Sequence, residues 1–241
     1  MTWIESLDDV RRDLVLANRI LAREGILDAF GHVSVRHPRE PSHFIMSWAR
    51  APELIEAGDL MEFGADGEVV AGDKFPYLER YIHAALYEHQ PETMAVCHNH
   101  TASILPFSIS RSVRLQPVIH TAAVLGGEAP VWDIADEFGT GTNLLVVNMQ
   151  QGRSLARTLG NGRIALMRGH GSVVTGVSIP AVVSACINMD KNARVQMQAM
   201  HFGEYTPLHP GEMVRPAVAP GQSAVPDRGW EAYVRRVTGP A

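Results

Sequence analysis

The sequence has few cysteines, no excess of positive charge and no unbroken hydrophobic run long enough for a membrane span. Two cysteines in 241 residues, Cys97 and Cys186, are too few for a disulfide framework. Lys plus Arg number 21 and Asp plus Glu number 26, so the net charge of -5 offers no basic surface for nucleic acid or an anionic membrane. The first residues lack the basic and apolar regions of a signal peptide. We therefore expect a compact cytoplasmic protein whose partners are neither nucleic acids nor membranes.

One stretch without charged side chains, Gly169 to Met189, is about as long as a membrane span. Gly171, Gly176 and Pro180 interrupt it, and such residues favour turns and breaks between elements. The pattern therefore predicts a turn, a short strand and the start of a helix in the core of a globular domain.

Helical and strand-like patterns alternate along the chain. Amphipathic periodicity and flanking Ser, Pro or Gly residues predict helices at 6–25, 77–88, 150–159 and 178–202. Short apolar runs predict strands at 31–36, 43–47, 94–98, 143–147, 164–167 and 172–177, with a hairpin near 64–67. This alternation predicts an α/β or α+β fold in which helices cover a sheet.

No repeat, low-complexity tract or interdomain linker is apparent, so residues 1–206 are expected to form one domain. The remaining residues, 207–241, contain five prolines: Pro207, Pro210, Pro216, Pro220 and Pro226. Because proline favours extended backbone, we expect this C-terminal extension to run over the surface before an amphipathic turn at 230–237. It would pack on the domain or on a neighbouring subunit.

Two histidines follow the apolar run at 94–96. His98 and His100 are two residues apart, so both imidazoles point to one side of the sheet if the strand continues. Such a pair suits a metal ion, although surface or hydrogen-bonded histidines show the same spacing. Cys97 alternates to the opposite face and is expected in the core.

A third histidine, His170, lies between two glycines in a predicted tight turn, where the backbone can approach a ligand. Three histidines with an open position are typical of a catalytic zinc-type site, whereas a structural site has a fourth protein ligand. A purely structural site would instead predict unfolding on chelation. Glu79, at the start of the helix before His98, is a candidate acid or base, and the helix dipole also favours a carboxylate there.

Together these residues resemble the class II aldolase/adducin family. Glu79 in Tyr77-Leu78-Glu79-Arg80, the run His98-Asn99-His100 and the turn Arg168-Gly169-His170-Gly171 match the family's acid/base glutamate and three metal histidines in order. Residues 31–36 are similar to the family's Gly-Asn-Val-Ser-x-Arg, and the resemblance covers residues 7–199. It implies a single-domain α/β fold of the three-layer α/β/α type and a homotetramer with active sites between subunits. It also implies one divalent metal ion per subunit, for which Mn²⁺, Zn²⁺, Fe²⁺ and Co²⁺ all suit imidazole and carboxylate ligands.

The chain departs from the sugar-phosphate aldolases of this family at the positions that hold phosphate. Those enzymes use an Asn after the first glycine, a hydroxyl-rich turn and two serines before the glutamate. This chain has His32, then Ser47-Trp48-Ala49-Arg50, then Tyr77-Leu78. Arg50 and His32 offer a cation and a donor, and Trp48 and Tyr77 offer flat apolar surfaces beside Ser47. This combination predicts a planar ring that carries carboxylates.

The aromatic decarboxylases of the family are similar at residues 31–36 and 47–53, where their patterns are Gly-His-Val-Ser-Val-Arg and Ser-x-x-Arg-Ala-Pro-Glu. This resemblance implies a metal-dependent lyase that decarboxylates a hydroxylated aromatic dicarboxylate. Examples are 3-hydroxy-2-methylpyridine-4,5-dicarboxylate from vitamin B6 degradation and a hydroxyphthalate. Such a substrate would chelate the ion through its ring hydroxyl and a carboxylate, and Glu79 would relay the proton that replaces CO₂.

Other assignments remain open. His120 is either a polar contact in the pocket or a satisfied core histidine, and Tyr205 is a candidate contact to a neighbouring subunit's site. Arg50 is also compatible with a solvated position at a strand end. The residues also suit a class II aldolase or epimerase acting on a non-phosphorylated sugar acid, which would release pyruvate or an aldehyde instead of CO₂. A non-catalytic adducin-like binding module is the remaining alternative, although it would not need the metal residues.

Overall fold

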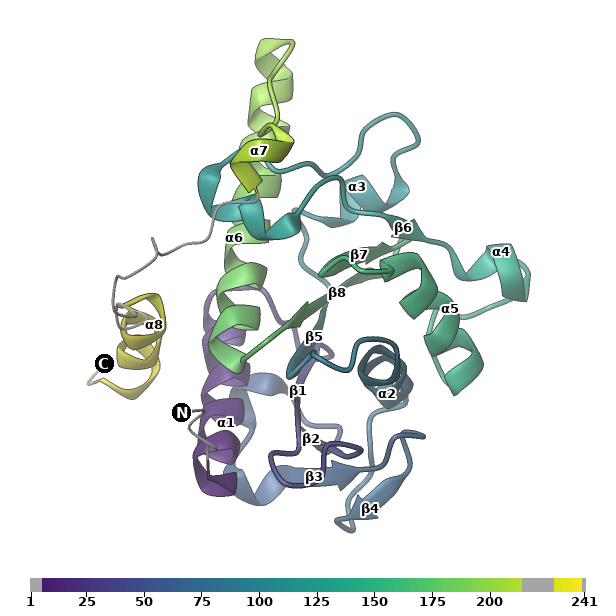
Figure 1. Cartoon of the computed structure of the whole chain (residues 1–241), viewed down its shortest axis with the longest axis vertical. Coiled ribbons are helices and arrows are strands. Elements are labelled where there is room, and N and C mark those ends of the chain that lie inside the picture. Colours follow the sequence, from purple (N-terminus) through teal and green to yellow (C-terminus); the bar gives the residue numbers. More distant parts are fainter. Residues whose placement is uncertain (1–5, 214–227, 240–241) are drawn as a thin grey trace.

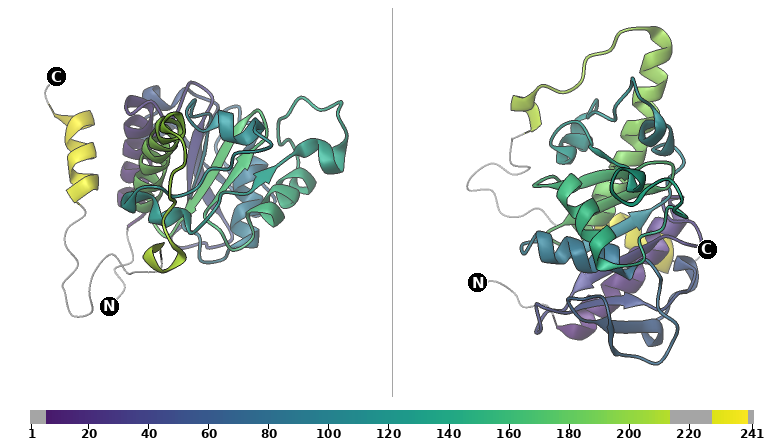
Figure 2. Two further views of the ribbon diagram at one scale, coloured as in Figure 1. Left: turned by 90° about the horizontal axis from the view of Figure 1, so that it is seen from above. Right: turned by 90° about the vertical axis from the view of Figure 1, so that its right-hand side faces the viewer.

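A computed structural model describes residues 6–213 and 228–239 of the chain. They form a three-layer α/β/α sandwich in which an eight-stranded sheet lies between two sets of helices (Figures 1 and 2). Helices α1 (Leu7–Arg23) and α6 (Ile179–Phe202) cover one face, and α2 (Arg80–His89) and α5 (Met149–Leu159) cover the other. This arrangement confirms the predicted fold class.

The sheet is antiparallel between all neighbouring strands except β6 and β7, which are parallel. The strand order across it is β4-β3-β2-β1-β5-β8-β7-β6. The strands are β1 (His32–Arg36), β2 (Phe44–Ser47), β3 (Leu60–Phe63), β4 (Val69–Ala71), β5 (Ala95–Asn99), β6 (Val131–Trp132), β7 (Ile164–Met167) and β8 (Gly171–Gly176). β1, β5 and β8 therefore lie side by side at the centre.

The long helices begin where the sequence signals predict. Ser6 caps α1 by accepting a hydrogen bond from the Asp9 N–H, and Ser178 caps α6 by accepting one from the Ala181 N–H. The shorter helices are α3 (Leu105–Ile109), α4 (Ile134–Phe138), α7 (Pro210–Met213) and α8 (Arg228–Thr238), and the 3-10 helices are η1 (Pro52–Leu54), η2 (Ala57–Asp59) and η3 (His120–Leu125).

Alternation along the central strands divides the buried side chains between two cores. On β5, Cys97 faces the core under α1 and α6, where Leu14 and Cys186 are also buried. Its neighbour Val96 faces the other core with Leu155 of α5. Cys97 is thus the core residue expected, and both cysteines are free thiols.

The C-terminal segment returns to the N-terminal helix. The apolar residues Trp230, Tyr233, Val234 and Val237 of α8 pack against the α1 side of the core, and Arg236 donates to the Glu24 carboxylate at 2.7 Å. The predicted amphipathic turn is thus an amphipathic helix that lies against the domain. Pro216, Pro220 and Pro226 lie outside the described residues, and the domain boundary at 206 stays a prediction.

The predicted strand at 143–147 is wrong. These residues form a loop, in which Leu144 has the left-handed φ of 67° that interrupts a strand. The Leu144 carbonyl accepts from His170 and the Val146 N–H donates to Glu79, so side chains use the backbone groups that a neighbouring strand would need.

The uncharged stretch from Gly169 to Met189 contains the turn before β8, β8 itself and the first part of α6, as predicted. Across residues 6–213 and 228–239, no helix combines the length and apolar character that crossing a bilayer requires.

Candidate metal centre

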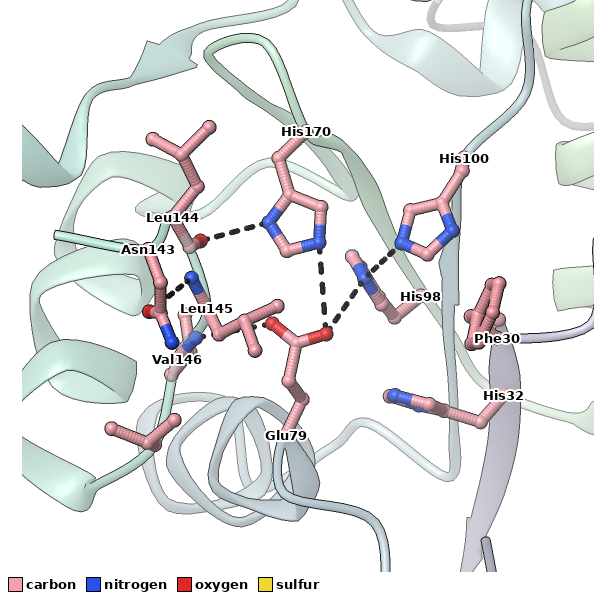
Figure 3. Close-up of polar contacts among 12 residues, drawn as sticks. Phe30, His32, Glu79, His98, His100, Asn143, Leu144, Leu145, Val146 and His170 are labelled. Carbon is pink, nitrogen blue, oxygen red and sulfur yellow. Dashed lines mark hydrogen bonds and ion pairs between the residues drawn. The ribbon is translucent and has the colours of Figure 1, made fainter. Parts of the chain in front are cut away.

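Four side chains from distant parts of the sequence converge beside the end of β5: Glu79, His98, His100 and His170 (Figure 3). Each offers one ligand atom, and these atoms all lie within 4.8 Å of one another. The Nε2 atoms of His98 and His100 are 3.0 Å apart. Glu79 Oε2 lies 3.5 Å from Nε2 of His98 and 3.6 Å from Nε2 of His170.

The sheet positions the histidines. His98 lies on β5, and His100 follows one residue after that strand ends. His170 lies in the turn between β7 and β8, where Gly169 has the left-handed φ of 65°. A Cβ on Gly171 would lie 2.2 Å from the Asn99 carbonyl oxygen, so this glycine allows β8 to approach β5. The glycines beside His170 therefore serve the turn and strand packing, and Gly169 also lines the cavity beside the cluster, so an approach of its backbone to a ligand stays a prediction.

Each imidazole of the cluster has a hydrogen-bond acceptor at Nδ1. His98, His100 and His170 contact the Ser172 carbonyl, the Asp28 carboxylate and the Leu144 carbonyl, at 3.1, 3.0 and 2.9 Å respectively. Because these acceptors require hydrogen on Nδ1, each neutral imidazole has its lone pair on Nε2. The three lone pairs then face one another and Glu79, which is the orientation that metal-ligating histidines take. The residues present therefore fit a divalent metal ion.

Glu79 lies at the N-cap of α2 but makes no capping hydrogen bond. Its Oε1 instead accepts from the Val146 N–H at 3.1 Å, and its Oε2 faces His98 and His170. Burial raises the pKa of this carboxyl group, but His98, His170 and the Val146 N–H together lower it to about 2. Glu79 is therefore ionised near neutral pH.

Two of the histidines are poor bases. Burial, with His98 acting in the same direction, lowers the pKa of His170 to about 4, and burial also lowers the pKa of His100. Near neutral pH the unprotonated forms predominate, and these are the forms that bind metal ions. The cluster thus requires little proton release before an ion can bind.

A cavity of about 630 Å³ opens beside the cluster. Its wall includes Glu79, His100 and His170, together with a set of apolar side chains: Phe30, Phe75, Leu78, Leu144 and Leu145. Among the described residues, no Lys or Arg lines it. The cavity therefore suits a largely apolar ligand that presents oxygen atoms to the cluster.

Two predicted substrate contacts line this cavity. The His32 and Tyr77 rings lie with their centroids 4.5 Å apart, and the Tyr77 hydroxyl donates to the Arg50 carbonyl. Ser47 is buried at the end of β2, and its hydroxyl has no hydrogen-bond partner within the described part of the chain.

Arg50, the cation predicted to contact the substrate, instead pairs with another side chain of the protein. The Arg50 side chain does not line the cavity and forms an ion pair with buried Asp59. Asp59 also accepts from Trp48 Nε1 at 2.8 Å and Lys74 Nζ at 2.9 Å. Burial raises the pKa of Asp59, but Lys74, Trp48 and the Glu56 N–H, together with Arg50, lower it overall. The structure therefore places Arg50 and Trp48 in a cluster around a carboxylate instead of in the cavity.

The two remaining candidates lie away from this cavity. His120 is exposed at the start of η3, so it is not the satisfied core histidine that the sequence allowed. The Tyr205 hydroxyl accepts from Gln196 at 2.9 Å and donates to Gln116 at 3.4 Å. Neither side chain lines the cavity of its own subunit.

Several residues of the site carry no sequence signal that reveals them. Asp28, which holds His100, is one of many acidic residues and lies between the predicted helix at 6–25 and the predicted strand at 31–36. Leu144 and Val146 act through backbone groups, which a sequence does not distinguish. Phe30 lies directly before the Gly31 motif, and its one sequence signal is that position.

Comparison with known proteins identifies similar chains. A family model described as Class II Aldolase and Adducin N-terminal domain matches residues 12–197. Decarboxylase tropJ from Talaromyces stipitatus is 32% identical, over 94% of this chain and 93% of that protein. A 3,4-dihydroxyphthalate decarboxylase from Arthrobacter keyseri is 25% identical, over 80% of this chain and 79% of that protein.

Solved structures show the same fold. An L-fuculose 1-phosphate aldolase from Glaciozyma antarctica matches with a TM-score of 0.70 at 24% identity, over 88% of this chain and 83% of that chain. An aldolase II superfamily protein from Pseudomonas syringae matches with a TM-score of 0.76 at 21% identity, over 95% and 91%. At these identities the matches support the fold and carry no conclusion about the reaction.

Replacement of His98, His100 or His170 by Ala removes one of three convergent imidazoles. Each variant is expected to bind zinc or manganese on the order of 100-fold more weakly, because three protein ligands leave little redundancy. Competition with a chromogenic chelator measures this affinity. His201→Ala is the matched control, since His201 is exposed on α6 and bonds only to the Met197 carbonyl among the described residues. Unchanged metal affinity in all three variants would contradict the assignment.

Proposed function

The chain belongs to the class II aldolase and adducin family, and from this membership we propose that it is a metal-dependent decarboxylase of a hydroxylated aromatic carboxylate. Its relatives include decarboxylases at 25–32% identity, which support a carbon–carbon lyase of the carboxy-lyase type. Three relatives at 23–25% identity are 3,4-dihydroxyphthalate decarboxylases, which makes a hydroxyphthalate one candidate substrate. A hydroxypyridine dicarboxylate such as 3-hydroxy-2-methylpyridine-4,5-dicarboxylate is another.

The observation that carries this proposal is the position of the candidate metal ligands beside an apolar cavity. The wall offers the Phe30 and Tyr77 rings and several leucines, but no described Lys or Arg that would hold a phosphate. An aromatic ring gains from contact with such walls, whereas a sugar would present mainly hydroxyl groups to them. An aromatic acid with adjacent oxygen atoms therefore fits the described wall better than a sugar phosphate does.

His98, His100 and His170 would hold the ion, with Glu79 beside them. When bound, a divalent ion would act as a Lewis acid that stabilises negative charge on a ring oxygen. Manganese, zinc, iron and cobalt all suit this set of ligands. The protein's part is to hold the lone pairs in place and to exclude water with the apolar wall.

Glu79 is placed to handle the proton. As an ionised carboxylate it can take the proton of the ring hydroxyl and then return it to the ring carbon that loses CO₂. In that step the bond between the ring and the carboxylate breaks, its electron pair stays on the ring, and a carbon–hydrogen bond forms. The Val146 N–H, which bonds Oε1, orients the carboxyl group so that Oε2 faces the cluster.

Two other functions are outcomes of the same assay. An aldolase or epimerase acting on a sugar acid would use the same cluster, and cleavage to pyruvate or an aldehyde would identify the aldolase. A binding module would show neither product. A screen of hydroxylated aromatic acids and short aldols with added metals distinguishes these functions, and CO₂ release from an aromatic acid is the result that supports the proposal.

Replacement of Glu79 by Gln keeps the size of the side chain and removes its ability to accept a proton. CO₂ release is expected to fall by a factor on the order of 100 or more, because general acid–base groups contribute about that much. Metal content and the unfolding midpoint should change little. Glu88→Gln is the matched control on the same helix, since Glu88 is exposed and pairs with Arg153. Near-normal turnover in Glu79→Gln would show that another group carries the proton.

Arg50 provides a test of substrate charge. Because its guanidinium pairs with Asp59, Arg50→Met is expected to change the affinities for a diacid, 3-hydroxyphthalate, and a monoacid, 2-hydroxybenzoate, by the same factor. Calorimetry with both ligands measures these affinities. A selective loss for the diacid, worth roughly 1.5–3 kcal/mol, would show instead that Arg50 reaches a substrate carboxylate.

We also propose that a neighbouring subunit closes the cavity in a homotetramer, as the family resemblance implies. Phe30, Phe75 and Leu78 line the cavity and are 72%, 71% and 51% exposed. Large apolar side chains exposed together mark surfaces that pack against another protein.

A cytoplasmic location stays a prediction, which the two free thiols support.

Light scattering tests this assembly. The unaltered chain is expected to have the mass of a tetramer, and Phe75→Ser is expected to shift it towards smaller species because the rim loses apolar area. Phe202→Ser is the control, since Phe202 is 92% exposed but does not line the cavity. A monomeric unaltered chain would contradict the proposal.

A further inference from the structure

A hydrogen-bonded network of four side chains extends from the cavity into the core between β1 and α2. His32 Nδ1 lies 2.6 Å from His83 Nε2, and His83 Nδ1 lies 2.6 Å from Ser34 Oγ. Ser34 Oγ in turn lies 2.8 Å from the Tyr87 hydroxyl. Only the first member, His32, lines the cavity, so the other three do not touch a ligand there.

The two inner members, Ser34 and His83, are isolated from water. All four side chains are buried, and His83 and Ser34 have no exposed surface. Phe44 covers them from β2, with its ring centroid 6.2 Å from that of His83 and 5.5 Å from that of Tyr87. Solvent therefore cannot supply donors or acceptors to His83 and Ser34, and these two groups depend on their side-chain partners.

Only one direction of these hydrogen bonds gives every donor an acceptor among the described residues. Burial raises the pKa of the Tyr87 hydroxyl, so it keeps its hydrogen, and Ser34 Oγ is its one hydrogen-bond partner among the described residues. Ser34 then donates its own hydrogen to His83 Nδ1. His83 must carry its hydrogen on Nε2, and it donates to His32 Nδ1. The reverse direction would bury the Tyr87 hydrogen without an acceptor.

His32 is consequently a neutral imidazole with its hydrogen on Nε2. This is the opposite tautomer from that of the three cluster histidines, whose hydrogens are on Nδ1. In this tautomer His32 has no lone pair on Nε2 for a metal ion, although its ring centroid is 5.1 Å from that of His98. Figure 3 shows the His32 ring to the right of the Glu79 side chain, on the same side of the site as Phe30.

We propose that Tyr87, Ser34 and His83 are positioning residues that hold His32 as a fixed N–H donor towards the cavity. His32 then recognises an acceptor oxygen of the ligand, such as the carboxylate of an aromatic acid, and disfavours a ligand group that can only donate. The part that names this ligand class rests on the proposed function; the direction of the hydrogen bonds does not.

Nitrogen NMR of the zinc-loaded full chain with ¹⁵N-labelled histidine tests the direction. His32 and His83 are both expected as Nε2–H tautomers, and a scalar coupling across the hydrogen bond should join His83 Nε2 to His32 Nδ1. The His83→Gln variant assigns the signals by removing those of His83. A hydrogen on His32 Nδ1, or a doubly protonated His32, overturns the proposal.

Binding of 2-hydroxybenzoate, followed by calorimetry, tests the consequence. His83→Met leaves His32 Nδ1 without a donor, so binding is expected to weaken about tenfold. His83→Gln retains an amide N–H and is expected to restore affinity to within about twofold. His89→Met is the matched control, because His89 is exposed on the same helix and contacts only the Gly160 carbonyl among the described residues.

The outcomes separate the two proposals. Equal affinity in His83→Met, His83→Gln and the unaltered chain overturns the positioning role even if all three turn over substrate. If 2-hydroxybenzoate does not bind the unaltered chain, the proposed ligand class fails. The NMR result then still decides the direction of the hydrogen bonds, because it needs neither ligand nor turnover. The same NMR measurement decides the matter if a variant does not fold.

Discussion

The Nε2 lone pairs of His98, His100 and His170 can point to a common centre only if each imidazole keeps its hydrogen on Nδ1, directed away from that centre. The acceptors that hold them come from β8, from the segment before β1 and from the loop before α5. No contiguous stretch of chain supplies even two of them together. The site therefore depends on the strand order that places β1, β5 and β8 side by side, and on a loop that reaches the same edge.

The loop at 143–147 shows how closely backbone and side-chain requirements are joined. Its Leu144 carbonyl orients His170, and its Val146 N–H orients Glu79. A strand would have directed these groups into a ladder with a neighbouring strand, where they could not serve two different side chains. The irregular backbone is thus the condition for orienting the acid/base candidate and one candidate ligand together.

Charge is distributed so that the cavity is left apolar. Asp59 gathers Arg50 and Lys74 together with the Trp48 indole, in a group that does not line the cavity. The polar side chains of its described wall belong to the cluster, to Tyr77 and Asn143, and to His32, whose tautomer is set by buried neighbours. A ligand is therefore recognised mainly by its shape and by oxygen atoms placed at a few points.

The amino-acid sequence by itself determined the elements with strong periodicity and the chemistry of the cluster. Apolar spacing placed the long helices and central strands, and His98, His100, His170 and Glu79 could be grouped through their motifs. The tertiary structure alone decided which charged side chains pair with one another and which line the cavity. Arg50 had a suitable position in the sequence, but its pairing with Asp59 depends on a fold that brings the turn after β2 against η2. Hydrogen-bond partners of this kind are set by distances across the fold, which periodicity along one chain does not encode.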